Sequence, residues 1–490
     1  MGSAIEFVTG TTRAARQKYR LHSRQQKRSG ATTAALPPKH RTLIYPKVLG
    51  QPPAREPVRP PGHDQPLSEC RWSGPRRIAQ ESDDAGHEVG LRMAASLLPV
   101  ATKETKAAKR TAHDNAIFKR FSLGVVTNRD DWLYDLDETR LTRKVSLFIE
   151  RYESERTRWE KAGRPDDTAA WVSRDIKSTS ELEAYLRRGT ALRFDSKRIR
   201  KAAYRPFVSM WTYYDHVITH RVYQQDSIFP IDKEVPNRCI VVSDPSAMKP
   251  WLVSAVGRLP DLHYVGAAAG AVCLPRWVIE RESTTDNITD WAFDRFRKRY
   301  QPGRDKKDRP ITKEAIFHYV YGVLHDPSYR EKYAQNLKRE LPRIPFYGDF
   351  WQWVDWGNAL MDLHIGFEQV APWKLLRTDV PDDKARKAGL APKALLKADK
   401  ESGRIFIDSE TKLAGIPPEA WEYMLGNRCA LEWILDQYKE KKPKDPTIRA
   451  KFNTYRFADY RKNVIDLLAR VTTVSVETQR IVAKMERTCR

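Results

Sequence analysis

Cysteine is scarce in this sequence and widely scattered. Five cysteines occur in 490 residues, and no two form a C-x-x-C pair. They are Cys70, Cys239, Cys273, Cys429 and Cys489. This spacing argues against a disulfide framework and against a zinc knuckle. The sequence also lacks an apolar run of about 18 residues and the short apolar core of a signal peptide. We therefore expect a soluble protein of the reducing cytoplasm with no membrane partner.

The motifs of ATP hydrolysis and methyl transfer are also missing. No G-x-x-x-x-G-K-[ST] phosphate loop occurs, so nothing indicates ATP hydrolysis. No [DNS]-P-P-[YFW] tetrad occurs either; an amino methyltransferase needs one to bind and stack on a flipped base. We interpret GAAAGA at 266–271 as small-residue packing or a turn. The sequence predicts no catalytic residue on this chain.

Two weaker patterns could suggest metal or nuclease chemistry. PDD at 165–167 and PDDK at 381–384 resemble paired nuclease carboxylates, but both lie in polar stretches. His216 and His220 are four residues apart, yet the residues between them favour a strand, and no third ligand is near in the sequence. We predict structural roles for these residues and no metal site.

Aromatic residues are rare near the start of the chain, where prolines are frequent. Residues 1–94 hold four of the 50 aromatic residues (14 Trp, 20 Tyr and 16 Phe) and ten of the 31 prolines. Segments such as 24–30 and 52–63 show neither the apolar period of a helix nor that of a strand. We predict that residues 1–95 are disordered and outside the fold, with a frameshifted or mis-called start as one hypothesis.

Positive charge is in excess over the whole chain. Lys and Arg number 87 against 63 Asp and Glu, so the formal net charge is +24. Residues 1–94 contribute 16 basic and 8 acidic residues, or +8, which leaves +16 for the remainder. Such an excess favours a polyanionic partner through phosphate contacts and counterion release. The alternative is a solvated basic surface without a partner.

From residue 96 onward the sequence predicts an α+β fold. Residues 199–280 are rich in β-branched and aromatic residues, which predicts a β-rich lobe. Residues 281–484 predict a mainly helical lobe with a polar linker at 377–402. Thr289 and Thr312 are expected to be N-caps. The predicted helices are 102–121, 138–162, 178–188, 289–300, 312–326, 328–340, 349–367, 418–438 and 455–484; the predicted strands lie within 122–135, 207–223 and 238–244.

Three segments of the predicted fold interleave basic, aromatic and amide residues. They are 293–300, 329–343 and 425–433. Arg and Lys can bind phosphates and guanine, Asn and Gln can pair with adenine, and aromatic rings can stack on bases. Each segment alone could be an ordinary amphipathic helix with a charged outer face. Their combination indicates nucleic-acid binding.

Long runs of residues 97–484 share the order and spacing of one protein family. The runs are TNRDDWLYD at 127–135, YRPF at 204–207, WTYYD at 211–215, IFP at 228–230, NITDW at 287–291, and longer stretches at 311–346, 415–438 and 474–482. The sequence resembles the C-terminal region of Type ISP restriction–modification enzymes. Such enzymes look like a nuclease, a helicase-type motor, an adenine-N6 methyltransferase and a target-recognition domain in series. The resemblance implies a target-recognition domain at 199–484, preceded at 96–198 by a helical remnant or linker from the methyltransferase side.

The resemblance also implies a function, which is sequence-specific recognition of double-stranded DNA. It assigns S-adenosylmethionine, ATP and Mg to the parent family and no cofactor to this chain, whose partners would be double-stranded DNA and a methyltransferase–helicase chain. Two alternatives stay open. The chain could be a subunit of an active adenine methyltransferase whose catalytic motifs come in trans, or a nonspecific basic nucleic-acid-binding protein.

The predicted DNA contacts are basic, amide and tyrosine residues. They are Arg205, Tyr213, Tyr214, Lys338, Arg339, Arg343, Asn427 and Arg428. The cations would bind phosphate or guanine, and the tyrosines would pack or stack. Neighbouring residues of a strand point to opposite faces, so we expect one of the two tyrosines to be structural.

Overall fold

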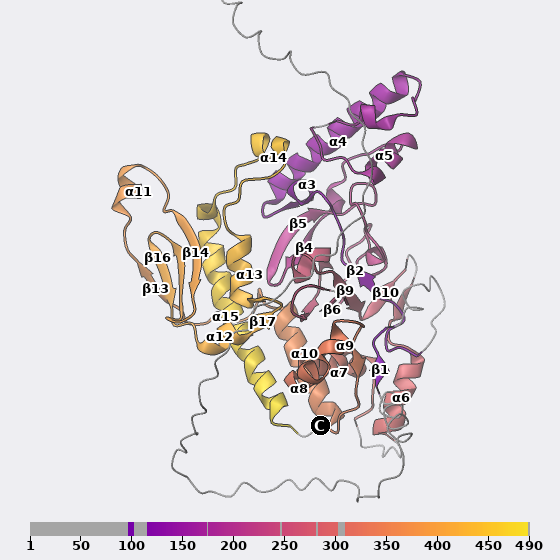
Figure 1. Ribbon diagram of the computed structural model, residues 1–490, viewed down its shortest axis with the longest axis vertical. Helices are drawn as coiled ribbons and strands as arrows, with labels where there is room; N and C mark the ends of the chain where they lie inside the picture. The colour runs from indigo at the N-terminus through magenta and orange to yellow at the C-terminus, as the bar shows by residue number, and fades with distance from the viewer. Residues whose placement is uncertain are drawn as a thin grey trace, which may run out of the picture. The chain divides into compact units, whose positions relative to one another are not determined.

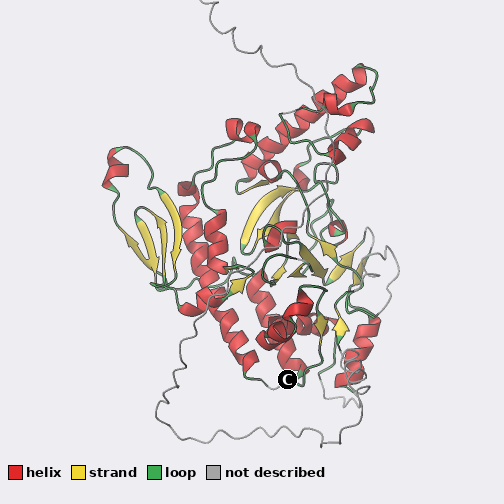
Figure 2. Ribbon diagram, in the orientation of Figure 1, coloured by secondary structure: helices red, strands yellow, loops and turns green. Residues whose placement is uncertain are grey.

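A computed structural model describes residues 97–101, 115–173, 175–245, 247–280, 283–301 and 309–488. Helices and strands are mixed along this part of the chain (Figures 1 and 2), which confirms the α+β prediction. No helix among these residues is long and apolar enough to cross a membrane. The predicted disordered segment 1–95 lies outside the described residues.

Two four-stranded sheets form the β-rich centre. Their strands are β2 (Ser122–Leu123), β3 (Tyr134–Asp135), β4 (Ile199–Arg205), β5 (Val208–Tyr213), β6 (Cys239–Ser243), β7 (Val253–Val256), β8 (Leu259–Pro260) and β9 (Ala271–Pro275). The strand orders are β2-β9-β6-β7 and β3-β5-β4-β8. Neighbours are antiparallel except β4 and β8, which are parallel. Cys239 and Val241 of β6 face one hydrophobic core, and Ile240 and Val242 face another. This strand is therefore buried on both faces.

Residues 96–198 contribute strands and helices to the same centre. β2 pairs with β9, and β3 pairs with β5. A further strand, β1 (Leu98–Pro99), pairs with β12 (Arg343–Ile344). The helices α4 (Glu138–Lys161) and α5 (Ser180–Arg187) confirm two predicted helices and share a core with Tyr213. Strands from residues 96–198 thus lie in the same sheets as strands from residues 199–280.

Three long helices form where the sequence predicts them. They are α6 (Asp290–Tyr300), α7 (Lys313–His325) and α10 (Phe350–Ile365). Thr289 and Thr312 are N-caps, because their side chains accept hydrogen bonds from the backbone N–H groups of Ala292 (3.1 Å) and Ala315 (3.0 Å). α7 and α10 cross with no room for a side chain at Gly357, where a Cβ would clash with the carbonyl of His318.

The remaining helices are shorter than predicted or lie where the sequence predicted no helix. They are α3 (Asp130–Leu133), α8 (Pro327–Lys332), α9 (Ala334–Leu337), α11 (Asp383–Lys387), α12 (Pro418–Glu422), α13 (Ala430–Gln437), α14 (Pro446–Lys451) and α15 (Arg461–Glu486). The small strands are β10 (Trp277–Ile279), β11 (Thr284–Asp286), β17 (Met424–Leu425) and β18 (Arg428–Cys429). A helix across 418–438 is wrong, because the β17–β18 hairpin turns at Gly426 with φ 70° and separates α12 from α13. Residues 115–121 are not helical, and the rest of the predicted helix 102–121 lies outside the described residues.

A third four-stranded sheet replaces the predicted polar linker at 377–402, so that prediction is wrong. Its strands are β13 (Leu376–Asp379), β14 (Ala394–Asp399), β15 (Arg404–Asp408) and β16 (Thr411–Ala414), in the order β13-β16-β15-β14. We call residues 374–414 the sheet lobe, seen at the left of Figure 1. One face of it, with Ile405, Ile407 and Leu413, belongs to the same hydrophobic core as α13 and α15.

Candidate nucleic-acid interface

The two predicted tyrosines lie in the interior. Tyr213 and Tyr214 are each 1% exposed. The hydroxyl of Tyr213 accepts a hydrogen bond from the backbone N–H of Asp195 (3.1 Å), and the Arg200 guanidinium lies 5.2 Å from the ring of Tyr214. The two rings point to opposite sides as expected, but each side is covered by a different core. We therefore correct the prediction: in this structure neither ring is offered to a base.

Arg205 is bound within the protein. Its guanidinium forms an ion pair with Asp261 at 2.7 Å and lies 3.9 Å from the centre of the Tyr204 ring. The Arg205 side chain is 12% exposed and that of Asp261 is 2% exposed. Burial raises the pKa of Asp261 to about 6, although Arg205 opposes that rise. Arg205 therefore compensates a buried carboxylate and is a structural residue here.

The other predicted contacts lie at the surface on two separate elements. Lys338, Arg339 and Arg343 follow α9, and all three are exposed. Arg343 forms an ion pair with Glu340 at 3.2 Å. In the β17–β18 hairpin Asn427 is exposed, whereas Arg428 is half-buried and pairs with Asp436 at 2.9 Å. These five residues stay predicted contacts.

A stronger basic surface lies on the segment that joins α13 to α15. Residues 439–456, which we call the basic connector, contain seven Lys or Arg and two Asp or Glu. All seven cations are exposed: Lys439, Lys441, Lys442, Lys444, Arg449, Lys451 and Arg456. Among the described residues, Lys441 alone of the seven has an ion-pair partner, Asp436 at 3.5 Å. Sequence reasoning missed this surface, although the run KEKKPK at 439–444 was a visible signal.

The basic connector is held on the TNRDDWLYD run by Asp445. One carboxylate oxygen of Asp445 caps α14, accepting from the N–H groups of Thr447 (2.9 Å) and Ile448 (3.0 Å). The other accepts a hydrogen bond from Nε1 of the buried Trp132 at 2.8 Å, and the Asp445 N–H donates to Asp131 at 3.2 Å. The lysines are thus presented on an anchored backbone, which reduces the ordering cost of binding.

A cleft of about 620 Å³ opens between the connector and this run. Asn128, Lys177 and Lys444 lie in its lining and are exposed. The buried Arg129 lines it too, and burial lowers the pKa of that guanidinium to about 10, so it is charged at neutral pH. Carboxylates also line the cleft; they are Asp130, Asp131, Asp261 and Asp445. The cations at the rim suit a polyanion that lies across the cleft, because these carboxylates would repel an anion that entered it.

The two histidines whose spacing could suggest a metal site, His216 and His220, contact different carboxylates. His216 and His220 lie in a turn rather than the predicted strand, and they pair with different carboxylates, Asp226 (3.3 Å) and Glu181 (2.7 Å). Within the described ranges, no group of three His, Cys, Asp or Glu could hold a metal ion. Asp382 of the PDDK run caps α11. The two histidines and Asp382 thus have partners within the protein.

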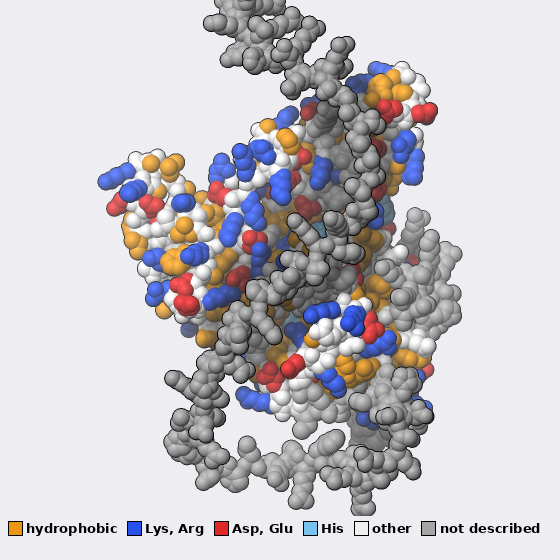
Figure 3. Space-filling model, viewed as in Figure 1, with side chains coloured by type: hydrophobic (Ala, Val, Ile, Leu, Met, Phe, Trp, Pro, Cys, Tyr) orange, Lys and Arg blue, Asp and Glu red, His pale blue; other side chains and the backbone are white. Residues whose placement is uncertain are grey.

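Basic side chains gather on the face that carries the connector. Figure 3 shows Lys and Arg around α14 and again over the sheet lobe at the left, with fewer Asp and Glu between them. The predicted DNA contacts Lys338, Arg339 and Arg343 follow α9 and belong neither to the connector nor to the sheet lobe. The connector and the lobe are thus two positive surfaces on the face that Figure 3 shows.

Comparisons with known proteins agree with these observations. A family profile described as the Type ISP C-terminal specificity domain matches residues 116–467. A cryo-electron microscopy structure of a DrdV–DNA complex shares 45% identity over 80% of this chain, with a TM-score of 0.71. A nuclease-deletion mutant of the Type ISP restriction–modification enzyme LlaGI, in complex with a DNA substrate mimic, shares 27% identity over 78% of this chain, with a TM-score of 0.62. No curated protein matches the sequence.

A more distant structure shares the fold. The ATP-dependent Type ISP enzyme LlaBIII, bound to DNA, has 21% identity over 80% of this chain and a TM-score of 0.64. The matching part of the chain spans 38% of the DrdV chain, 34% of the LlaGI chain and 24% of the LlaBIII chain. The family match begins at residue 116 and thus takes in α4 and α5, in line with their shared core. Because residues 116–467 are well over half of the sequence, the chain belongs to the family of the Type ISP C-terminal specificity domain.

Proposed function

We propose that this chain recognises one specific sequence in double-stranded DNA, as the specificity part of a Type ISP restriction–modification enzyme. The observation that carries the proposal is the anchored basic connector, in a chain 45% identical to a protein solved in complex with DNA. Cations with few acidic neighbours bind phosphates and fix the register of a duplex. Exposed amide and arginine side chains such as Asn427 and Arg339 are then candidates to read base edges.

The proposal places catalysis and its cofactors on a partner. S-adenosylmethionine, ATP and Mg would bind a methyltransferase–helicase chain or region, and this chain would present DNA to it in the cytoplasm. The test is direct: purified chain is incubated with DNA and labelled S-adenosylmethionine. We expect no methyl transfer by the chain alone, and transfer without a partner would contradict this division of roles.

Sequence preference separates the proposal from a nonspecific basic protein. Binding to a randomised duplex library, with several rounds of selection, should enrich one short sequence. Specific binding is typically 10³-fold or more tighter than nonspecific binding, so we expect a preference of about that size. As a control, alanine at Lys442, Lys444 and Lys451 should weaken binding to every sequence alike, because phosphate contacts do not read bases. Equal binding across the library would refute the proposal.

A further inference from the structure

The outer face of the sheet lobe carries a row of cations around an aromatic ring. Lys397 on β14 is opposite Phe406 on β15, and Phe406 is opposite Lys412 on β16. Opposite residues of antiparallel strands share a face, and Arg404 shares it as well because it lies two residues from Phe406. The Lys412 ammonium lies 5.6 Å from the centre of the Phe406 ring. This face points away from the core, since the alternate residues of β15 are the buried ones.

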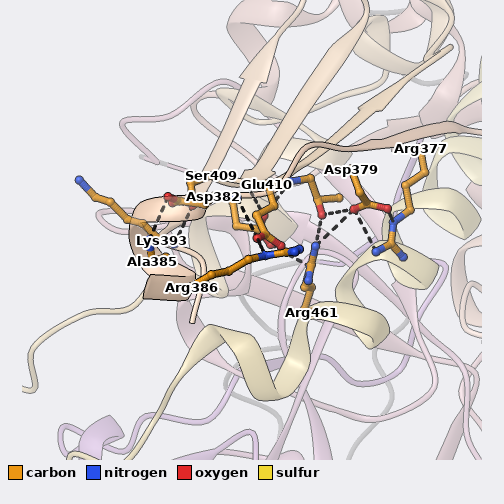
Figure 4. A network of polar contacts seen from close by, with 11 residues as sticks. Arg377, Asp379, Asp382, Ala385, Arg386, Lys393, Ser409, Glu410 and Arg461 are labelled. Atoms are coloured by element: carbon orange, nitrogen blue, oxygen red, sulfur yellow. Dashed lines mark hydrogen bonds and ion pairs between the residues drawn. The ribbon is translucent and has the colours of Figure 1, made fainter. Parts of the chain in front are cut away.

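Several carboxylates of the lobe gather at one edge, where arginines pair with them. Figure 4 shows Asp379, Glu410 and their arginine partners. The Arg386 Nε lies 2.9 Å from Glu410, and the Arg377 Nε lies 2.8 Å from Asp379. The Arg461 guanidinium lies 3.4 Å from Asp379. The hydrogen bond from Thr411 is the main reason why the pKa of Asp379 is lowered. The hydrogen bond from Arg386 does the same for the pKa of Glu410.

Two further carboxylates at this edge are satisfied by the protein. Asp382 accepts hydrogen bonds from Ser409 Oγ (2.6 Å) and from the Ala385 N–H (3.1 Å). Asp408 accepts from the Thr411 N–H (2.7 Å) and pairs with Arg461 Nε at 2.8 Å. Four of the seven carboxylates of the lobe thus have partners at one edge.

The outer face is left with an excess of positive charge. Residues 374–414 hold ten Lys and Arg and seven Asp and Glu. Among the described residues, neither Lys397 nor Lys412 has an ion-pair partner. Asp399 is in register with this face; it lies opposite Arg404 and accepts a hydrogen bond from Ser402 Oγ at 2.6 Å. Asp408, two residues from Phe406, shares the face by the same alternation and is paired with Arg461. Such a face suits a polyanion.

Arg461 fixes the lobe relative to the basic connector. It is the first residue of α15 and follows the connector by five positions. Its guanidinium contacts Asp379 of β13, Asp408 of β15 and Thr411 of β16. Asp445 thus anchors the connector to Asp131 and Trp132, and Arg461 joins the lobe to the start of α15, which follows the connector in the chain.

We infer that the sheet lobe is a second DNA-binding surface, and that Lys397, Arg404 and Lys412 bind the phosphate backbone of the duplex that the connector binds. The inference rests on the proposed function and adds a surface to it. Neighbouring strands are ~4.8 Å apart, so Lys397 and Lys412 are separated by ~10 Å. This corresponds to roughly three base-pair rises of 3.4 Å along the axis of the duplex. Arg461 is a positioning residue, because it binds the lobe and not the DNA.

The test is the salt dependence of binding to the duplex that the library selects. Lys397, Arg404 and Lys412 are replaced together by alanine in the full chain, and Kd is measured by fluorescence anisotropy between 50 and 200 mM salt. Three lost phosphate contacts should lower the slope of log K against log salt by about 2.7. The rise in Kd over this range should then be about 40-fold smaller than for the unchanged chain, with the sequence preference retained.

A matched variant controls for the loss of charge. Alanine at Lys161, Arg188 and Arg193 removes three exposed cations near the ends of α4 and α5, and its slope should equal that of the unchanged chain. Circular dichroism and thermal unfolding check that both variants fold. If the unchanged chain shows no sequence preference, the proposed function fails. If it shows one and the lobe variant keeps the full slope, the lobe inference alone is wrong. Loss of single-strand binding with duplex binding unchanged would also overturn it.

Discussion

The hydrogen bond between the Trp132 indole and the Asp445 carboxylate, which attaches the basic connector, can be removed by a single substitution. The change Asp445→Ala deletes the N-cap of α14, which costs about 1 kcal/mol. It also leaves the N–H of the buried Trp132 indole without a partner, which costs about 1–3 kcal/mol. The Asp445 backbone N–H still donates to Asp131. We therefore expect the connector to open more easily by about 2–4 kcal/mol, while the central sheets stay folded.

Asparagine at position 445 separates the two contributions. An Asn side chain keeps one carbonyl oxygen for the cap but turns its amide N–H toward the N–H of Trp132. The change Asp445→Asn should thus cost about 1–3 kcal/mol. When Trp132→Phe removes the indole donor as well, the combined cost should be less than the sum of the two single costs, because the two N–H donors then no longer face each other.

Hydrogen exchange measures this opening directly. The N–H groups of Arg449 and Phe452 donate to the carbonyls of Asp445 (2.9 Å) and Ile448 (2.8 Å), so they are protected only while α14 is formed. For Asp445→Ala, a loss of about 2–4 kcal/mol corresponds to exchange roughly 30- to 1,000-fold faster at these amides. DNA affinity should fall with it, since the lysines are no longer preorganised. Unchanged exchange at 446–452 in a folded Asp445→Ala protein would refute the anchoring role.

Three other changes have expected outcomes. Arg461→Lys keeps the charge but cannot make the planar fork, so amides of β15 and β16 should exchange faster and the salt slope of DNA binding should fall; if exchange in the lobe does not change, Arg461 does not position it. Gly357→Ala places a Cβ against the His318 carbonyl and should destabilise the α7–α10 crossing by about 1–3 kcal/mol or more in urea unfolding, whereas Gly348→Ala, whose Cβ meets nothing within 4 Å, should not. Burial lowers the pKa of His364 from 6.5 to about 3, so its neutral form stabilises the fold above pH 6.5 and that stability is lost as the pH falls toward 3. The loss is about 2 kcal/mol at pH 5, and His364→Asn should show a smaller decrease between pH 7 and 5 in the same unfolding assay.

Features set by a few neighbouring residues could be predicted from the sequence. The Thr289 and Thr312 caps and the helices α4, α6, α7 and α10 depend on local side chains and on one apolar stripe. The sheet lobe could not be predicted as readily. All four residues of its edge strand β13 are exposed, so the strand has no alternating pattern, although Ile405 and Ile407 in RIFID did alternate and were a usable signal.

The candidate interface was harder to predict than the fold. Tyr213 and Tyr214 looked like surface residues because a strand exposes one face in many proteins, yet here long-range packing covers both sides of β5. Arg205 looked like a DNA contact because its partner Asp261 is 56 residues away. The lysines of the connector were visible in the sequence, but the Trp132–Asp445 bond that orders them joins residues 313 apart. Such distant pairs leave no pattern in one sequence.

The register of the sheet lobe has a consequence for how such chains can vary. Leu376 and Ala414, the first and last residues of the lobe sheet, are paired with each other, so the chain leaves and re-enters the core at one place. Ile405, Ile407 and Leu413 on the inner face are tied to that core, whereas Lys397, Arg404 and Lys412 on the outer face are not. New residues on the outer face can therefore be accommodated without repacking the interior, provided that the inner-face residues are kept. The packing of the core thus constrains the residues of the inner face, whereas those of the outer face are free to differ between relatives.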